Sequence, residues 1–201
     1  MAHPKQREFC NKVKQLLPEY FDNVSVLDIG SLDINGNNLY LFTNHVYMGI
    51  DVGRGKNVNY VSLGHEYLPL DGKKYDVVIS TECFEHDQFW DKTIKNVIDN
   101  LVREGGLFMF TCATTGRPEH GTRRTTAHDS PFTSKIDSWS DYYMNLTEED
   151  VRSKINLDKY FTMYKFYVDT ESHDLYFWGI RNSDWHDKSS IQISYKQGKC
   201  E

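Results

Sequence analysis

The stretch VSVLDIGSLDING, residues 24–36, decides the fold of this chain. Its first half is a short apolar run that stops at Gly30, as a buried parallel strand does before the chain turns into a crossover. Asp28 is an acid inside this strand, and Gly30 and Gly36 bound a tight loop that can approach a ligand closely. The next glycine of the GxGxxG fingerprint is missing, which disfavours a nicotinamide enzyme. Alone, the pattern also fits a strand that ends in an Asx-type turn.

Strands and helices alternate outward from this stretch. Apolar spacing predicts an amphipathic helix over residues 4–21 and another over residues 89–101, which a Gly105-Gly106 stop would end. The predicted strands are residues 24–29, 45–51, 57–62, 75–80 and 106–112. This alternation predicts a doubly wound α/β domain with a mostly parallel sheet, helices on both faces, and a ligand beyond the carboxyl ends of the strands.

The C-terminal third departs from this regular alternation. Residues 114–143 have no sustained period and read as a long loop, which in a compact domain is typically functional or disordered. Thr147 and Asp150 form a near capping box at the start of a helix, and residues 160–182 predict two strands joined by a turn. We therefore expect an N-terminal helix (1–23), one domain (24–183) and a peripheral tail (184–201).

Composition and charge exclude several classes of protein. The chain has 201 residues, of which 39% are hydrophobic and 14% aromatic, enough for one independently folding core. A net charge of −6 without a run of Lys and Arg argues against a nucleic-acid partner. No stretch is apolar enough for a membrane span or a signal peptide, so no membrane partner is expected. The four cysteines stand far apart, which fits reduced thiols in the cytoplasm.

A second acid follows the second predicted strand. Asp51 ends that strand beside the first loop, where a carboxylate can accept both hydroxyls of a ribose. With this pairing the sequence resembles the class I S-adenosylmethionine-dependent methyltransferases, and more narrowly their type 11 group. The resemblance covers roughly residues 24–181. The segments that carry it are GSLDING, YMGIDVGRG, VVISTECFEHD, GGLFMFTC and DLYFWGIRN.

The resemblance implies a fold and a set of cofactor contacts. The fold is a Rossmann-like domain with a seven-stranded sheet, mostly parallel, whose last strand is antiparallel. Residues around the methionine part of S-adenosylmethionine would be Asp28, Gly30, Ser31 and Gly36. Asp51 would bind the ribose, the loop with Gly64 and His65 would flank the adenine, and Glu82 would complete the cofactor site. Many relatives have an acid after the third strand, whereas this chain has Ser62-Leu63-Gly64-His65.

The segment ECFEHD, residues 82–87, follows the fourth predicted strand. It resembles the ExxEH motif of ubiquinone-pathway O-methyltransferases and plant small-RNA 2′-O-methyltransferases, where two acids and a His bind a divalent ion with a further His. That resemblance implies a Mg²⁺ or Mn²⁺ site formed by Glu82, Glu85, His86 and His120, although the spacing to His120 departs from those families. The alternative is that Glu85 and His86 merely cap and orient the next helix.

A sugar hydroxyl is a poor nucleophile, so a base or an ion is needed to loosen its proton. His120 is the first candidate for the catalytic base and Glu85 the second. If no ion is present, His120 acts alone or catalysis rests mainly on proximity.

Three arginines in the long loop suggest the acceptor. Arg117, Arg123 and Arg124 can hold the phosphate of a nucleotide-linked sugar, or stack on a sugar ring; alternatively they form surface ion pairs with Glu119 or Asp129. The following aromatic residues, Trp139, Tyr142 and Tyr143, are platforms for sugars or pack the loop onto the core. ECFEHD with GRPEHGT also resembles methyltransferases of bacterial and viral glycan biosynthesis.

The sequence thus favours O-methylation of a sugar or glycan hydroxyl. The alternatives are O- or N-methylation of another small metabolite, and a catalytically silent cofactor-binding module of a glycan-synthesising assembly. The remaining histidines and all four cysteines receive no role: His3, His45, His128, His173 and His186, with Cys10, Cys83, Cys112 and Cys200.

Overall fold

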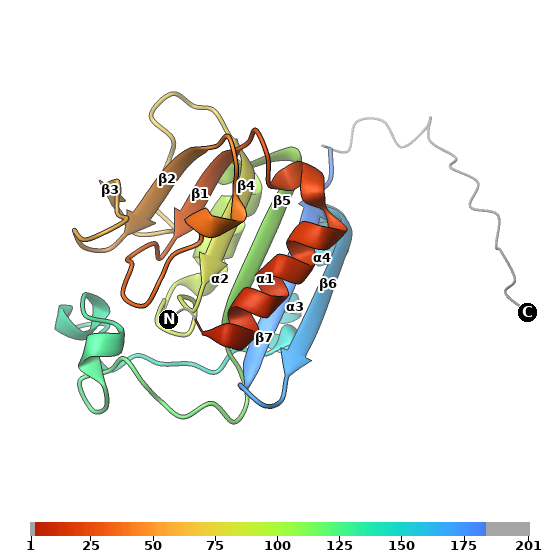
Figure 1. The fold of residues 1–201 in the computed structure, drawn as a ribbon. Coiled ribbons are helices and arrows are strands. Elements are labelled where there is room, and N and C mark those ends of the chain that lie inside the picture. Colours follow the sequence, from red (N-terminus) through yellow and green to blue (C-terminus); the bar gives the residue numbers. More distant parts are fainter. Residues whose placement is uncertain (1–2, 184–201) are drawn as a thin grey trace, which may run out of the picture.

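The computed structural model describes residues 3–183, which form one sheet covered by helices on both faces (Figure 1). The seven strands lie in the order β3-β2-β1-β4-β5-β7-β6. Their bounds are β1 Ser25–Ile29, β2 Val46–Asp51, β3 Tyr60–Val61, β4 Tyr75–Thr81, β5 Val102–Ala113, β6 Phe161–Asp169 and β7 Asp174–Arg181. Strand β7 runs antiparallel to both neighbours, and the other pairings are parallel. The predicted doubly wound sheet with an antiparallel last strand is confirmed.

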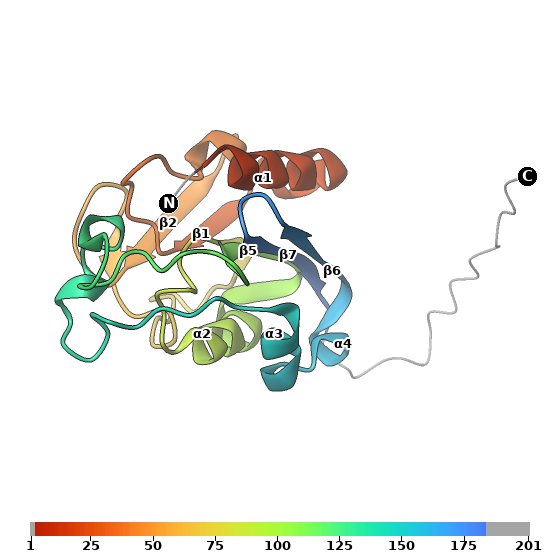
Figure 2. The same cartoon turned by 90° about the horizontal axis from the view of Figure 1, so that it is seen from below.

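The helices divide between the two faces of the sheet. Helix α1 (Pro4–Leu16) covers one face, and α2 (Trp90–Asn96), α3 (Glu148–Lys154) and α4 (Leu157–Tyr160) cover the other (Figure 2). A π-helical turn, Val97–Leu101, extends α2. The apolar side of α1 packs directly on the sheet.

Alternation along the strands separates the core into two layers. In β1, Leu27 and Ile29 pack with the helices α2 to α4, whereas Val26 packs with α1. Phe9, Cys10 and Val13 of α1 are buried in this second layer, as the amphipathic spacing predicts.

Three predicted boundaries are wrong. Helix α1 ends at Leu16, and Pro18 begins a 3-10 turn, because proline has no N–H for the helical ladder. Gly105-Gly106 does not precede the fifth strand but lies inside β5, where φ of +67° at Gly105 accompanies a shift in the pairing with β4. Strand β3 has only two residues.

The long loop from Thr114 crosses the carboxyl ends of the parallel strands. It contains two 3-10 turns, Ala127–Asp129 and Thr133–Lys135, and its teal part lies beside the ends of β2 and β3 in Figure 1. We call residues 114–143 the acceptor loop, after the expectation from the sequence that its arginines contact the acceptor.

No helix within residues 3–183 is long and apolar enough to cross a membrane. The predicted peripheral tail, 184–201, lies outside the described residues, as does His186.

Candidate active site

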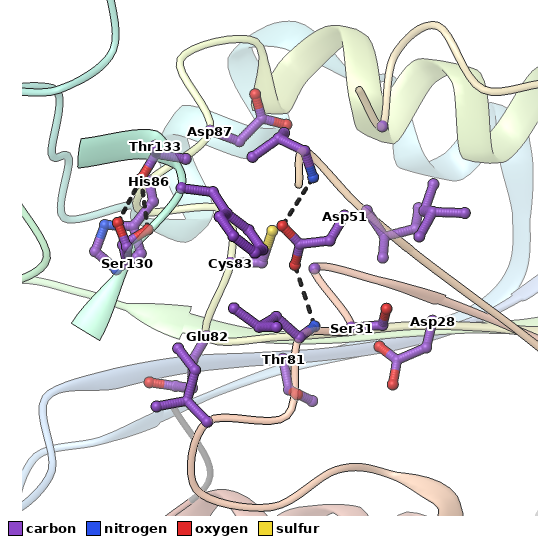
Figure 3. A pocket seen from close by; sticks show the side chains of 18 of the residues that line it. Asp28, Ser31, Asp51, Thr81, Glu82, Cys83, His86, Asp87, Ser130 and Thr133 are labelled. Carbon is purple, nitrogen blue, oxygen red and sulfur yellow. Dashed lines mark hydrogen bonds between the residues drawn. The ribbon is translucent and has the colours of Figure 1, made fainter. Parts of the chain in front are cut away.

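An open cavity of about 960 Å³ lies at the carboxyl ends of β1, β2 and β4, where the alternation predicted a ligand (Figure 3). The loops after these strands and the acceptor loop line it. The predicted cofactor residues that line it are Asp28, Gly30, Ser31, Gly36, Asp51, Gly64 and Glu82.

Asp28 is buried beside the cavity with an incomplete set of partners. Its Oδ2 accepts hydrogen bonds from the Tyr47 hydroxyl (2.7 Å) and the Asn38 amide (2.9 Å), whereas its Oδ1 has none. Burial raises the pKa of Asp28 to about 7, despite the hydrogen bonds from Tyr47 and Asn38. A buried carboxylate oxygen without a donor, at the edge of a cavity, suits a cationic or N–H group of a ligand.

Asp51 joins the first two loops of the cavity. Its Oδ2 accepts from the backbone N–H of Leu32 (3.1 Å) and its Oδ1 from that of Val52 (2.8 Å), as Figure 3 shows. Burial raises the pKa of this carboxyl as well. Each oxygen keeps a free lone pair, so a diol can bridge both oxygens from the cavity side.

Aromatic side chains anchor the acceptor loop to the rest of the molecule. Phe132 lies against Gly53, where a Cβ would come within 2.6 Å of the Phe132 ring. Trp139 packs edge-on against Phe89 with ring centroids 5.7 Å apart. Phe132 and Trp139 both line the cavity. The loop therefore lines one side of the cavity with apolar rings.

Glu85, His86 and His120 meet next to the cavity, as the sequence predicted. Their ligand atoms lie within 4.8 Å of one another, and His86 also lines the cavity. Both carboxylate oxygens of Glu85 and Nδ1 of His86 are buried without a hydrogen-bond partner. Burial, together with the charge of Glu82, raises the pKa of Glu85 to about 8. Burial also lowers the pKa of His86 to about 3.

The ring of His120 presents a lone pair to Glu85. Its Nδ1 lies 3.1 Å from the carbonyl oxygen of Pro118, which only accepts, so Nδ1 carries the proton of the neutral ring. Burial lowers the pKa of His120 and so favours this neutral form. Nε2 is then free of a proton and lies 4.0 Å from Glu85 Oε1. Two acceptors facing each other across a buried gap favour a cation or a donated proton between them.

Gly121 allows the acceptor loop to reach this cluster. Its φ is +69°, and a Cβ there would lie 2.6 Å from Cε1 of His86. Tyr143 closes the other side, with ring centroids 5.0 Å from His120 and 5.6 Å from His86. The two ends of the loop thus meet at the Glu85 cluster.

Glu82 does not join this cluster. It lies in a second group with His3 and Asp174, in which His3 Nε2 is 2.9 Å from Asp174 Oδ2 and 3.7 Å from Glu82 Oε2. Burial opposes both charges, but the ion pairing outweighs it, and the pKa of His3 rises to about 9 while that of Glu82 falls to about 2. The four-residue metal set implied by the resemblance is therefore divided between two groups.

The three arginines of the acceptor loop are paired with acids of the chain itself. Arg117 contacts Asp174 (3.1 Å), Arg123 contacts Asp141 (2.8 Å) and Arg124 contacts Glu119 (3.0 Å). These contacts correspond to the ion-pair alternative, with Asp141 and Asp174 in place of Asp129.

Several residues of the site were missed or misjudged from the sequence. His65 does not line the cavity; its ring packs on Phe89 at 4.6 Å. Asp87 lines the cavity and binds the Thr93 hydroxyl at 2.6 Å, and its place beside Glu85 and His86 was the available signal. Nothing in the sequence pattern pointed to Phe132 or His3, because their partners are distant along the chain.

Comparisons with known proteins agree with this architecture. A family model described as a methyltransferase domain matches residues 1–143. No curated protein matches the sequence. The solved 1,6-didemethyltoxoflavin-N1-methyltransferase of Burkholderia thailandensis, with bound S-adenosylhomocysteine, is 13% identical over 89% of this chain and 78% of its own, with a TM-score of 0.59.

Two further solved structures have the same fold. The N-methyltransferase NodS of Bradyrhizobium japonicum WM9 is 14% identical over 90% of this chain and 99% of its own (TM-score 0.53). Phosphoethanolamine N-methyltransferase 2 of Haemonchus contortus is 14% identical over 86% of this chain and 53% of its own (TM-score 0.56). The sheet, mostly parallel with an antiparallel last strand, is that of a Rossmann-like methyltransferase fold. The chain belongs to the methyltransferase domain family.

Proposed function

We propose that this protein transfers a methyl group from S-adenosylmethionine to a hydroxyl group, and that the acceptor is a sugar or glycan. The observation that carries the proposal is a pair of acids, the buried Asp28 and the half-buried Asp51, at adjacent strands of one cavity in a methyltransferase domain. A hydroxyl acceptor is favoured by the unprotonated Nε2 of His120 beside that cavity.

The residues present fit S-adenosylmethionine. The unpartnered Oδ1 of Asp28 suits the ammonium group of the methionine part, and the free lone pairs of Asp51 suit the two ribose hydroxyls. Phe132 supplies an apolar surface that excludes water. When bound, the cofactor supplies a methyl group on a positively charged sulfur, which leaves as a neutral thioether.

His120 acts on the acceptor. Nε2 of His120 would take the proton of the acceptor hydroxyl as its oxygen receives the methyl group, and the bonding electron pair would stay on the sulfur of the departing thioether. General-base assistance of this kind contributes on the order of 10²–10⁴ in rate. The Pro118 carbonyl holds Nδ1–H and so keeps the ring in the receptive tautomer. Glu85 is the second candidate for the base: its raised pKa makes its ionised form a stronger base than an ordinary carboxylate, and that form predominates above about pH 8.

A divalent ion fits the Glu85 cluster. One carboxylate and two imidazoles with unpartnered atoms match the ligand preferences of Mn²⁺ and related ions, and the Pro118 carbonyl orients His120 as an outer partner of a ligand does. Glu85, His86 and His120 would hold the ion, which would lower the pKa of a bound hydroxyl. Mg²⁺, which prefers oxygen ligands, suits this set less well.

The test is transfer of labelled methyl from S-adenosylmethionine to a panel of sugars, oligosaccharides, nucleotide sugars, phenols and amines, with added Mn²⁺ and with chelator. We expect transfer to a glycan hydroxyl, and a loss of transfer in His120→Ala that far exceeds its loss of cofactor binding. Equal losses of transfer and binding would make His120 structural. Transfer that continues in the presence of chelator would show that the reaction needs no divalent ion, with His120 acting alone as the base.

The panel also discriminates the competing functions. Transfer to amines alone would favour the N-methylating alternative, since the structural neighbours NodS and the toxoflavin enzyme are N-methyltransferases. Calorimetric binding of cofactor without any transfer, unaffected by loss of Glu85, His86 or His120, would favour a silent binding module. Absence of binding heat with both S-adenosylmethionine and its demethylated product would contradict the proposal that S-adenosylmethionine is the methyl donor.

A further inference from the structure

We propose that His3, at the start of helix α1, is a positioning residue of the active site: it fixes the side chain of Glu82 on the wall of the cavity and so couples docking of α1 to cofactor binding. The inference uses the proposed function only in choosing S-adenosylmethionine as a probe. His3 is 78 positions from Thr81, the end of strand β4, yet its imidazole reaches the residue that follows that strand.

Glu82 needs such a support. Its φ is +52°, in the left-handed region that a residue with a side chain rarely adopts, so neighbouring groups must hold it there. Thr111 donates a hydrogen bond to Oε1 (2.8 Å), but Oε2 is buried without a hydrogen bond. His3 Nε2 is the cation that faces this oxygen, at 3.7 Å. Without His3, a buried charge on the cavity wall would lose its counter-charge.

Asp174 holds the imidazole of His3 in place. This carboxylate is fully buried at the start of β7 and lies 2.9 Å from His3 Nε2. Arg117 of the acceptor loop contacts the other oxygen, Oδ1, at 3.1 Å, and the Tyr176 hydroxyl donates to Oδ2 at 3.2 Å. The N-terminal helix and the acceptor loop therefore meet on one buried acid.

The body of α1 sets the position of His3. Phe9 stacks on Tyr176 with ring centroids 4.7 Å apart, and Cys10 and Val13 are buried against the sheet. His3 also contacts the backbone N–H of Gln6 through Nδ1 at 3.4 Å, a long contact that protonation of the ring would break. The carboxylates are thus its stronger partners.

The experiment compares three variants of the full chain. His3→Ala removes the contact, His3→Gln keeps an N–H donor near the position of Nε2, and Lys5→Ala is the matched control. Lys5 lies in the first turn of α1, close to His3 along the chain. It pairs with Glu171, in the turn between β6 and β7 (2.8 Å), away from the cavity. The measurements are the Kd for S-adenosylmethionine by calorimetry, the melting temperature, and hydrogen exchange of the backbone amides from Thr81 to Asp87.

We expect His3→Ala to weaken cofactor binding about tenfold, the effect of losing a contact to a charged group, and to speed exchange over Thr81 to Asp87. His3→Gln should restore much of both, and Lys5→Ala should change neither. A His3→Ala variant that lowers only the melting temperature, with wild-type Kd and exchange, would overturn the inference.

Failure of the proposed function is distinguishable. If the wild-type protein itself does not bind S-adenosylmethionine, the donor is wrong, and the exchange measurement decides the role of His3. Faster exchange over Thr81 to Asp87 in His3→Ala then supports positioning of Glu82, and unchanged exchange rejects it.

Discussion

At the scale of single residues, the site depends on acids that the fold keeps out of water. Asp28 and Glu85 are buried and Asp51 is half-buried, and desolvation raises the pKa of each. A strand end is where such residues can be both buried in the sheet and open to a ligand. Keeping a charged carboxylate at this position costs free energy of folding. The same position lets the carboxylate bind a cofactor, a proton or an ion.

Asp51→Asn should weaken binding of S-adenosylmethionine about 10- to 100-fold, because hydrogen bonds from a diol to a charged acceptor are stronger than those to an amide. The exposed Asp71, which bonds only within its own turn, provides the control Asp71→Asn. Calorimetry measures both. Equal affinity in the two variants would contradict a ribose contact at Asp51.

Glu85→Gln should stabilise the metal-free protein at pH 8 relative to the wild type, with little difference at pH 5. The folded-state pKa of Glu85, about 8, lies above its ordinary value of 4.5, so the folded state binds the proton more tightly than the unfolded state. The wild type therefore loses stability as pH rises from about 4.5 to about 8, whereas the neutral amide does not.

Thermal unfolding in EDTA at both pH values measures this difference. Glu19→Gln, at an exposed side chain, is the control. A Glu85→Gln variant that is less stable than the wild type at pH 8 would show that the carboxylate is ionised and held by a partner.

At the scale of elements, local sequence signals set the ends of helices, and tertiary contacts set the rest. The Thr147 side chain accepts a hydrogen bond from the backbone N–H of Asp150, and the Asp150 carboxylate accepts one from the backbone N–H of Thr147. This is the capping box that the sequence predicted at the start of α3. The short strand β3 and the glycine pair inside β5 were not predictable in this way. Their bounds depend on pairing with β2 and β4, which are remote in sequence.

Thr147→Ala should lower the free energy of unfolding by about 1 kcal/mol through loss of the helix cap, with methyl transfer unchanged. Thr147→Ser, which keeps the hydroxyl, should stay close to the wild type. Denaturant titration measures the change. A loss of transfer at unchanged stability would mean that α3 takes part in the site.

At the scale of the whole molecule, the site is complete only when the acceptor loop lies on the strand ends. Phe132 packs on Gly53 after β2, and Tyr143 packs on His120 and His86. The backbone N–H of Met144 donates a hydrogen bond to the carbonyl oxygen of Glu85 (2.9 Å), which ties the end of the loop to the segment after β4. The acceptor loop thus contacts both the cofactor cavity and the proposed base, so the two adjoin each other.

Gly53→Ala should weaken cofactor binding, because its Cβ would lie 2.6 Å from the Phe132 ring and would displace the loop. Phe132→Ala removes the ring with which the new Cβ would clash. Gly53→Ala should therefore weaken cofactor binding less in the Phe132→Ala background than in the wild type. A double-mutant cycle on the Kd for S-adenosylmethionine measures this coupling. Strict additivity of the two changes would contradict contact between the loop and Gly53.

The sequence by itself determined the sheet and most of the cofactor cavity. Apolar strands that each end in an acid or glycine are local patterns, and the parallel topology brings their ends to one edge. Asp28, Gly30 and Asp51 could therefore be predicted.

Only the tertiary structure decided how the remaining side chains are shared out. In the folded chain, Glu82 lies with His3 and Asp174, whereas Glu85 and His86 lie with His120. The loop arginines form ion pairs with acids of the chain. These contacts join segments up to 171 positions apart, as between His3 and Asp174. No local pattern encodes such a distance, because a loop and a helix N-terminus take their places only when the whole core has packed.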